Sequence, residues 1–289
     1  MLATRFQTLA GDARHIVGVA PAPHTRRDAW LAPAAIRARN AGSMSEFGDT
    51  VDRNDIDRFA AQSAAWWDPE GSFRPLHRIN PARLDFIRRQ LLASFGRDAK
   101  GLRPFEGLRL IDIGCGGGLV AEPMIRLGFA VTGIDADASA IEVAHAHAEA
   151  SGLAIDYRTA SIEEIAATGE RFDVALALEI VEHVADRDAF FAALGALVGP
   201  SGAFIGATLN RTAQSFALAI VGAEYLLGWL PRGTHDWRRF VRPSEFVLGL
   251  RRQGLAATSL AGLSYDWRRA IWAESEDLSV NYMIAAVRR

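Results

Sequence analysis

From residue 108 onward, short apolar runs alternate with stretches whose apolar residues recur every three or four positions. The first pattern is typical of buried strands and the second of amphipathic helices. The predicted strands span residues 109–113, 130–134, 154–157, 174–178 and 203–208, and the helices between them span 119–127, 139–150 and 188–198. Strands that alternate with helices form a mainly parallel sheet with helices on both faces. The sequence therefore predicts a doubly wound α/β fold.

Further elements are predicted on either side of this core. A helix over 247–253 precedes two late strands, 256–260 and 282–287, which raise the number of strands to seven. Two helices come before the sheet, one over 52–67 and one over 82–95 that ends at Gly96. Between them, Pro75 and the pair Asn80-Pro81 predict a loop, because proline cannot donate a helical hydrogen bond.

Composition and charge narrow the classes of partner. The chain has 289 residues, a formal net charge of -2 and an isoelectric point near 6.4, which argue against a nucleic-acid-binding protein. Its single cysteine, Cys115, excludes an internal disulfide and a thiolate metal cluster. With no candidate base beside it, Cys115 is interpreted as a small side chain in a crowded turn.

A glycine loop follows the first predicted strand. Gly114, Gly116, Gly117 and Gly118 come directly after the apolar run, where the backbone can approach a ligand closely at a helix N-terminus. Asp135 lies 21 residues after Gly114, at the end of the next strand. A carboxylate at this place accepts hydrogen bonds from ribose hydroxyl groups. The ligand is therefore expected to contain an adenosine-like ribose, with Gly114, Gly116 and Asp135 among its contacts.

Two cofactor classes fit such a loop, and Asp112 separates them. The segment from Gly116 to Ala121 also matches the pattern of dinucleotide enzymes, which would make the chain a nicotinamide oxidoreductase. Asp112, however, would repel a pyrophosphate, whereas it can orient the loop or meet a cationic amino group. Together with Phe172-Asp173-Val174 and Leu178-Glu179, this stretch resembles class I S-adenosylmethionine-dependent methyltransferases. S-adenosylmethionine is the favoured cofactor, and the oxidoreductase is the last-ranked alternative.

The segment after the fourth strand offers groups for methyl transfer. If a helix begins there, Glu179, Glu182 and His183 lie on one of its faces, at positions i, i+3 and i+4. They are then able to bind one divalent ion, with magnesium suited to the carboxylates and zinc or manganese to the imidazole. Alternatively, His183 acts as a general base that removes a proton from a hydroxyl group. Both interpretations stay open at this point.

The other histidines are weaker candidates. His145 and His147 lie on one predicted helix and are expected to face solvent. After His183, only His77 and His235 merit mutation.

The most apolar run of the chain covers residues 216–230 and contains Glu224. Its 15 residues fall short of the roughly 20 that a helix needs to cross a bilayer. With the arginines and tryptophans that follow, residues 213–240 fit a helix that lies on an anionic membrane. A lid buried over the active site is an equally good interpretation of residues 213–230.

Motifs outside the glycine loop carry a more specific resemblance. They cover residues 66–71 (WWDPEG), 75–83 (PLHRINPAR), 221–225 (VGAEY), 233–236 (GTHD) and 280–283 (VNYM). Together they make residues 52–287 similar to the ubiquinone biosynthesis O-methyltransferase family of bacteria and mitochondria.

The resemblance implies a specific activity. Family members methylate a ring hydroxyl of polyprenylated phenols or catechols at two steps, the second of which converts 3-demethylubiquinol to ubiquinol. By position, their cofactor contacts fall on Arg83, Gly114, Asp135 and Leu178, and a divalent ion is described for the mitochondrial relatives at the segment 179–183. Arginine suits the methionine carboxylate of the cofactor because it forms two parallel hydrogen bonds.

The same resemblance implies a cytoplasmic enzyme bound peripherally at the bacterial inner membrane, with the matrix side of the mitochondrial membrane less favoured. It also implies a place in a ubiquinone-synthesis complex. Two alternatives to the quinone activity remain, which are methylation of a soluble phenol and a noncatalytic cofactor-binding component of such a complex.

The domain organisation follows from these assignments. Residues 1–43 hold six arginines and few acids, which predicts a disordered leader or a misassigned start before Met44. The rest, 44–289, is predicted to be one methyltransferase domain. Its parts are the N-terminal helices (52–107), the cofactor-binding core (108–208), a substrate- or membrane-facing insertion (209–245) and the C-terminal helix and strands (246–289).

Overall fold

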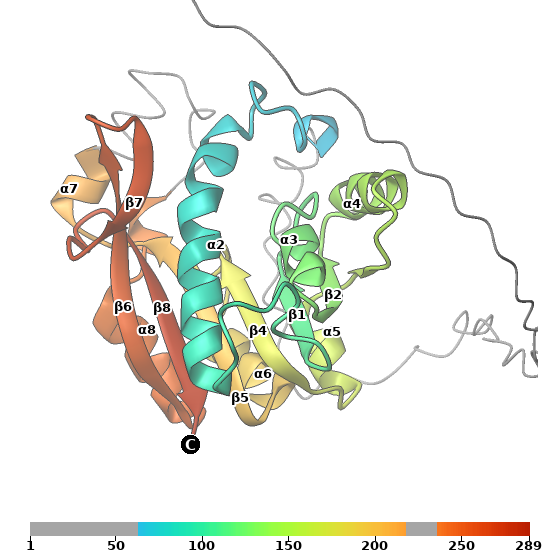
Figure 1. The fold of residues 1–289 in the computed structure, drawn as a ribbon. Coiled ribbons are helices and arrows are strands. Elements are labelled where there is room, and N and C mark those ends of the chain that lie inside the picture. Colours follow the sequence, from blue (N-terminus) through green and yellow to red (C-terminus); the bar gives the residue numbers. More distant parts are fainter. Residues whose placement is uncertain (1–62, 218–235) are drawn as a thin grey trace, which may run out of the picture. The chain divides into compact units, whose positions relative to one another are not determined.

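One sheet organises the part of the chain that the computed structural model describes, residues 63–217 and 236–289 (Figure 1). Its eight strands are β1 (Arg109–Ile113), β2 (Ala130–Asp135), β3 (Asp156–Thr159), β4 (Phe172–Leu178), β5 (Val198–Leu209), β6 (Leu255–Asp266), β7 (Ile271–Ser275) and β8 (Asn281–Arg288). Their order is β3-β2-β1-β4-β5-β8-β6-β7, parallel from β3 to β5 and antiparallel beyond. The predicted doubly wound α/β class is confirmed.

The strand missing from the prediction is β7, which pairs antiparallel with the end of β6. Its side chains are exposed or only half-buried, so the sequence carries no buried apolar run there. The predicted number of seven strands was therefore one too low.

Helices cover both faces of the sheet. The described helices are η1 (Ser63–Ala65), α2 (Arg74–Phe95), α3 (Ala121–Arg126), α4 (Ala138–Ala150), α5 (Ile162–Ala167), α6 (Arg187–Leu197), α7 (Ala213–Ser215), η3 (Trp237–Arg239) and α8 (Pro243–Arg252). One buried cluster joins the sheet to α2, α3 and α4, and a second joins the other face to α5, α6 and α8 (Figure 1). Successive strand residues alternate between them, so Leu110 lies in the first cluster and Ile111 in the second.

Helix α2 corrects the predicted N-terminal elements. It starts at Arg74 and runs through Pro81, where a loop was predicted. Pro75 occupies its first turn, where a missing N–H costs nothing, and burial of Phe86, Ile87 and Leu91 offsets the bond lost at Pro81.

The end of α2 at Gly96 is confirmed, with a left-handed φ of 58°. Most of the helix predicted over 52–67 lies outside the described residues. Its described end is η1 followed by a turn.

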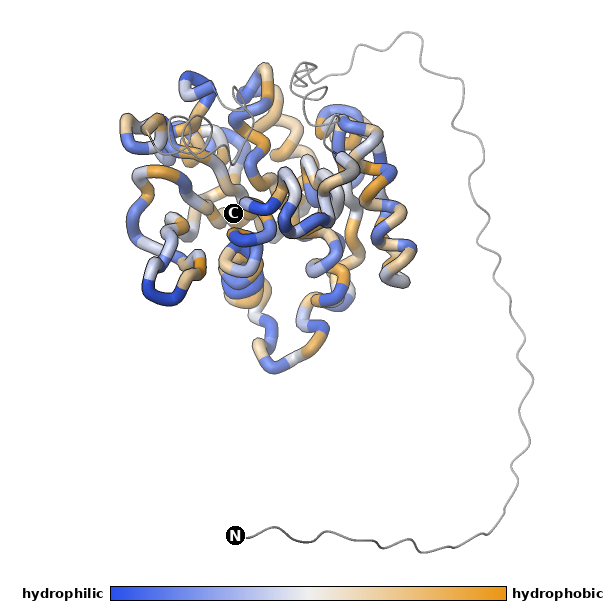
Figure 2. The backbone as a smooth tube through the Cα atoms, turned by 90° about the horizontal axis from the view of Figure 1, so that it is seen from above, coloured by the Kyte–Doolittle hydropathy of each residue, from blue (hydrophilic) through white to orange (hydrophobic). Residues whose placement is uncertain are grey.

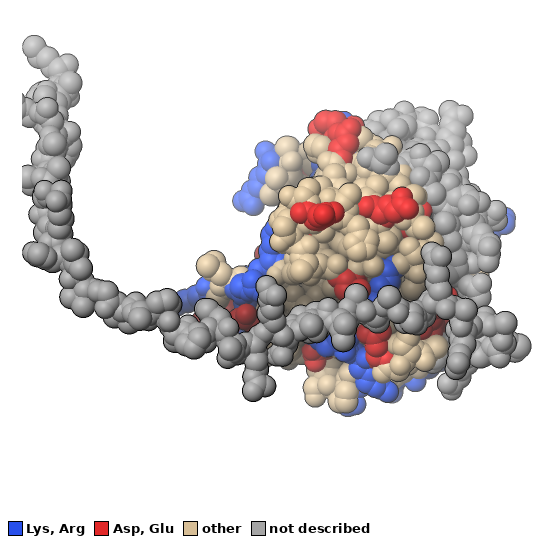
Figure 3. All heavy atoms as spheres, turned by 90° about the vertical axis from the view of Figure 1, so that its right-hand side faces the viewer, with Lys and Arg blue, Asp and Glu red and all other residues tan. Residues whose placement is uncertain are grey.

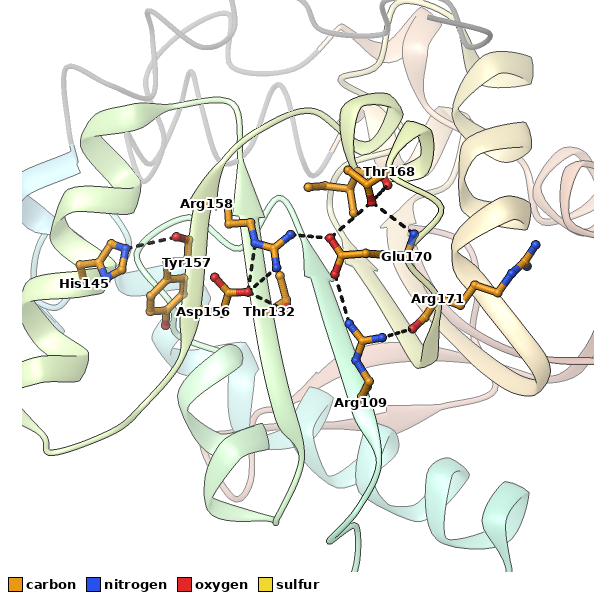
Figure 4. A network of polar contacts seen from close by, with 10 residues as sticks. Arg109, Thr132, His145, Asp156, Tyr157, Arg158, Thr168, Glu170 and Arg171 are labelled. Carbon is orange, nitrogen blue, oxygen red and sulfur yellow. Dashed lines mark hydrogen bonds and ion pairs between the residues drawn. The ribbon is translucent and has the colours of Figure 1, made fainter. Parts of the chain in front are cut away.

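A polar network holds the amino ends of β1, β3 and β4 together (Figure 4). Arg158 donates to Glu170 at 2.7 Å and to Asp156 at 3.0 Å, and Arg109 donates to the other oxygen of Glu170 at 3.1 Å. The hydrogen bond from Arg158 holds the pKa of the Glu170 carboxyl below its ordinary value. This network fixes the strands at the edge opposite the glycine loop.

The described surface carries mixed charge. On the face drawn in Figure 3, acidic and basic side chains are interspersed without a continuous basic stripe. Hydrophobic and hydrophilic stretches alternate along the helices and strands in Figure 2. None of the described helices has the length and apolar character required to span a bilayer. The predicted domain boundary at 43/44 and residues 218–235 of the insertion lie outside the described residues.

Candidate active site

The glycine loop leaves β1 at the carboxyl edge of the sheet, as the sequence predicts. Three glycines of this loop, Gly114, Gly116 and Gly118, have left-handed φ angles of 69°, 51° and 89°. Residues that carry a side chain rarely adopt such angles. The N–H groups of Gly114 and Cys115 both donate to the Ile134 carbonyl of β2, at 2.8 and 2.9 Å. These bonds tie the loop to the end of the neighbouring strand.

Asp135 ends β2 directly beside this loop. Its carboxylate accepts hydrogen bonds from the backbone N–H groups of Gly116 and Asp137, both at 2.9 Å. Burial raises the pKa of Asp135 above its ordinary value, while the two backbone donors act in the opposite sense. The structure thus brings Gly116 of the predicted cofactor loop into direct contact with Asp135, the predicted ribose acid.

Asp112 lies beneath the loop, in β1, where it is register partner of Gly133. Its side chain is 3% exposed, and its Oδ2 atom has no hydrogen-bond partner among the described residues. Burial, together with the charge of Asp135, raises the pKa of Asp112 from 3.8 to about 7. A buried acceptor of this kind is suited to a cationic donor.

Arg83 reaches the site from α2. Its guanidinium group pairs with Glu179, which follows the last residue of β4, the half-buried Leu178. Glu179 itself adopts a left-handed φ of 56°, which is rare for a residue with a side chain. The Arg83 side chain is buried, and its Nε atom has no partner among the described residues. The predicted residues Arg83 and Leu178 therefore lie at the same edge as the glycine loop.

The helix expected at Glu179–His183 is absent. A turn closes there instead, with the His183 N–H donating to the Ile180 carbonyl at 2.8 Å, and α6 begins only at Arg187. Glu182 points to Thr208 of β5, whose hydroxyl donates to it at 2.8 Å.

This arrangement does not fit the predicted divalent-ion site. The described residues contain no group of three or more His, Cys, Asp or Glu side chains placed to hold a metal ion. The Glu179 carboxylate pairs with Arg83, whereas Glu182 is buried and accepts the Thr208 hydroxyl. Burial, reinforced by the charge of Glu179, raises the pKa of Glu182 to about 8.

Cys115 and the two histidines of α4 differ in their surroundings. Cys115 is buried, and burial raises the pKa of its thiol well above the ordinary value, which agrees with an unreactive side chain. The expectation that His147 faces solvent was wrong: it is half-buried and bonded to Glu122 at 2.5 Å. His145 is exposed as expected.

Three described residues of the other motifs, His77, Asn281 and Tyr282, make structural contacts. The His77 ring bonds to the Trp66 carbonyl at 2.8 Å, and His235 lies outside the described residues. The side-chain oxygen of Asn281 accepts a hydrogen bond from the backbone N–H of Leu263 in β6 at 2.8 Å. Tyr282 donates to the Val241 carbonyl at 3.0 Å. The motif 280–283 thus joins β8 to its neighbours.

Sequence reasoning noticed Trp66 and Trp67 only as a motif. In the structure both pack on the glycine loop, and Trp67 Nε1 donates to the Gly117 carbonyl at 2.8 Å. No pattern of spacing signals this contact, because it joins residues 50 positions apart.

Comparison with known proteins agrees with this geometry. A methyltransferase domain model matches residues 76–260. A ubiquinone biosynthesis O-methyltransferase from Paramagnetospirillum magneticum is 53% identical over 239 residues, which cover 83% of this chain and 96% of the relative. Another from Dinoroseobacter shibae is 52% identical over 246 residues, covering 85% and 99%.

Solved structures show the same fold at low identity. The magnesium protoporphyrin IX methyltransferase from Synechocystis PCC 6803, with bound SAH, superposes with a TM-score of 0.55 at 18% identity, covering 82% of this chain and 95% of that one. The PH0226 protein from Pyrococcus horikoshii gives 0.53 at 12% identity, covering 78% and 95%. By fold, by domain model and by close sequence relatives, the chain therefore belongs to the ubiquinone biosynthesis O-methyltransferase family of S-adenosylmethionine-dependent enzymes.

Proposed function

We propose that this enzyme transfers a methyl group from S-adenosylmethionine to a ring hydroxyl of a polyprenylated phenol, catechol or quinol, including 3-demethylubiquinol. The observation that carries the proposal is a pair of acids, the buried Asp112 and the half-buried Asp135, which lie at adjacent strand ends around the glycine loop. The substrate class is supported by the ubiquinone-biosynthesis relatives at about half identity over nearly their full length.

The chain's own residues fit the cofactor at each of its polar ends. Asp135 receives the ribose hydroxyls, and the unpartnered Oδ2 of Asp112 receives the amino group. The buried Nε of Arg83 offers a donor for the carboxylate, and Leu178 flanks the adenosine by apolar contact. When bound, S-adenosylmethionine supplies a methyl group already activated by its sulfonium sulfur.

The acceptor oxygen must lose a proton as it attacks. A phenol titrates near 10, so a base is needed at neutral pH. We assign this role to His183, which lies in the turn after β4 at the edge where the cofactor residues meet. Glu182, beside it, is engaged by Thr208 and positions this turn against β5. The proposed mechanism needs no divalent ion: Glu179 pairs with Arg83, and Glu182 accepts the hydroxyl of Thr208.

The decisive experiment compares His183→Ala with His145→Ala, an exposed histidine on α4 that serves as the matched control. With labelled S-adenosylmethionine and a demethylated quinol, His183→Ala should reduce kcat by about 10²- to 10⁴-fold, the usual contribution of a general base. Affinity for S-adenosylhomocysteine should change less than twofold. Full turnover by His183→Ala would remove His183 from the mechanism. Loss of native activity with a chelator, restored by one divalent ion, would reinstate the metal.

The product's mass distinguishes the acceptors. Methylation of short-chain quinol analogues supports the proposed substrate class. Turnover only on a soluble phenol would replace that class and leave the cofactor site intact. Cofactor binding with no turnover on any phenol would leave a noncatalytic component of a quinone-synthesis complex.

We also propose that the insertion contacts an anionic membrane from the cytoplasmic side, since a polyprenyl tail lies in the bilayer. Its described flanks carry a 46% exposed Phe216 and, in η3, Trp237 with Arg238 and Arg239. The native protein should sediment with anionic liposomes, and a variant that lacks residues 213–230 should stay in the supernatant. Equal sedimentation of both would favour the lid. Co-purification with other quinone-synthesis enzymes would test membership in a complex.

A further inference from the structure

The glycine loop is covered by a segment that the proposed mechanism does not use. This cap, residues 63–67, lies just before α2 and beside α4 (Figure 1, blue). The Trp66 indole rests on the loop: a Cβ atom added to Gly117 would lie 2.5 Å from Cβ and Cγ of Trp66, and one on Gly116 would collide with the far end of the ring. The indole therefore occupies the space that these two glycines leave open.

Trp67 ties three parts of the site together. Its Nε1 atom donates to the Gly117 carbonyl at 2.8 Å. Its ring stacks on His147 of α4, with centroids 3.4 Å apart and planes 4° from parallel. His147 in turn bonds at 2.5 Å to Glu122, which is fully buried in the first turn of α3. One side chain thus connects the glycine loop to the helices that follow β1 and β2.

The cap is anchored on both sides of the tryptophan pair. The Ser63 hydroxyl donates to Asp137 at 2.9 Å, and Asp137 is the N-cap of α4 whose own N–H bonds to Asp135. On the other side, Trp66 stacks on Phe73 with centroids 3.8 Å apart. The cap therefore reaches from the start of α2 to Asp137, which lies two residues after Asp135 and is hydrogen-bonded to it.

We propose that Trp66 and Trp67 are positioning residues for the cofactor: the cap closes on the glycine loop, holds its Gly117 carbonyl in place and slows cofactor release. The proposal rests on S-adenosylmethionine binding at this loop. Trp66 Nε1 is buried and has no partner among the described residues, so the closed cap presents a spare donor at the loop. Opening of the cap exposes Gly116 and Gly117 and admits the cofactor.

Three variants separate the contacts. Trp66→Ala removes the cover over the glycines. Trp67→Phe keeps an aromatic ring, smaller than the indole, against His147 and deletes the N–H that donates to Gly117. Trp267→Ala, at a tryptophan that is 83% exposed in the turn between β6 and β7, is the matched control.

The dissociation rate of S-adenosylhomocysteine, followed by stopped flow, should rise about tenfold in Trp66→Ala and about fivefold in Trp67→Phe, the scale of one lost hydrogen bond or ring contact. It should stay within twofold of native in Trp267→Ala. The KM for S-adenosylmethionine should rise by the same factors while kcat falls less than threefold. A role in folding alone would instead lower the melting temperature and leave the dissociation rate unchanged.

A measurement on the native chain covers the case of variants that do not fold. Hydrogen exchange of the backbone amides of residues 63–73 should slow when S-adenosylhomocysteine is bound. Unchanged exchange, or dissociation rates within twofold of native in both cap variants, would overturn the cap proposal alone. Absence of any S-adenosylhomocysteine binding by the native protein would overturn the proposed function instead.

Discussion

Asp112 connects the burial of a single carboxyl group to both stability and cofactor binding. Its pKa is raised from 3.8 to about 7, a difference worth about 4 kcal/mol between the two protonation states. The folded protein keeps this proton between pH 4 and 7, whereas the unfolded chain loses it. The stability so contributed is fully present below pH 4 and is lost as pH rises through 7. As pH rises from 4 to 8, the free energy of unfolding should fall by about 4 kcal/mol more in the native protein than in Asp112→Asn, because the asparagine side chain has no proton to lose.

Cofactor binding should release the proton of the Asp112 carboxyl group. A cationic amino group beside Asp112 favours its ionised form, so a bound ligand lowers its pKa. Binding of S-adenosylhomocysteine should then release about 0.9 proton at pH 6, about 0.5 at pH 7 and about 0.1 at pH 8. Asp112→Asn should release none from this position and should bind more weakly at pH 8.

Isothermal titration calorimetry in two buffers of different ionisation enthalpy measures the protons released. The native protein and Asp112→Asn are compared at each pH, so that titration of the ligand's own amine cancels. Equal release by both proteins at pH 6 would refute a contact between Asp112 and the amino group. Parallel curves of unfolding free energy against pH would refute the raised pKa itself.

Three further predictions concern residues around the loop. Gly114→Ala should weaken S-adenosylhomocysteine binding, because the Gly114 φ angle is 69° and an added Cβ atom would collide with Ile180. Gly96→Ala is the matched control: the φ angle is 58°, and no atom lies within 4 Å of the added Cβ atom. This control should lower the free energy of unfolding by about 1 kcal/mol and leave binding unchanged. Arg83→Gln should raise the Kd about tenfold if its guanidinium holds the cofactor carboxylate, and calorimetry showing no change would assign Arg83 to structure alone. Tyr282→Phe removes a buried donor to the Val241 carbonyl, so urea unfolding should show a loss of about 1 kcal/mol, with catalytic activity retained; reduced kcat in the folded variant would contradict this structural role.

The pattern of apolar residues predicted strands and helices correctly where buried positions recur at regular intervals along the chain. The run at 109–113 coincides with β1, and Gly96 ends α2 as predicted, because each depends on neighbours in sequence. Pro81 misled the prediction, since packing of the α2 face against the sheet outweighs one missing hydrogen bond. The helix expected directly after β4 does not form, because Glu179 adopts a left-handed conformation that a helix cannot contain.

The sequence by itself determined the class of fold and the position of the glycine loop beside Asp135. Alternating strands and helices require a parallel sheet, and the carboxyl ends of adjacent strands bring Gly114 and Asp135 to one edge. Only the tertiary structure decided what surrounds that edge. Trp66 and Trp67 cover the loop through contacts that depend on packing between segments about 50 residues apart, which no local pattern encodes. The same is true of Glu179, whose partner is chosen by the position of α2 rather than by spacing along its own segment.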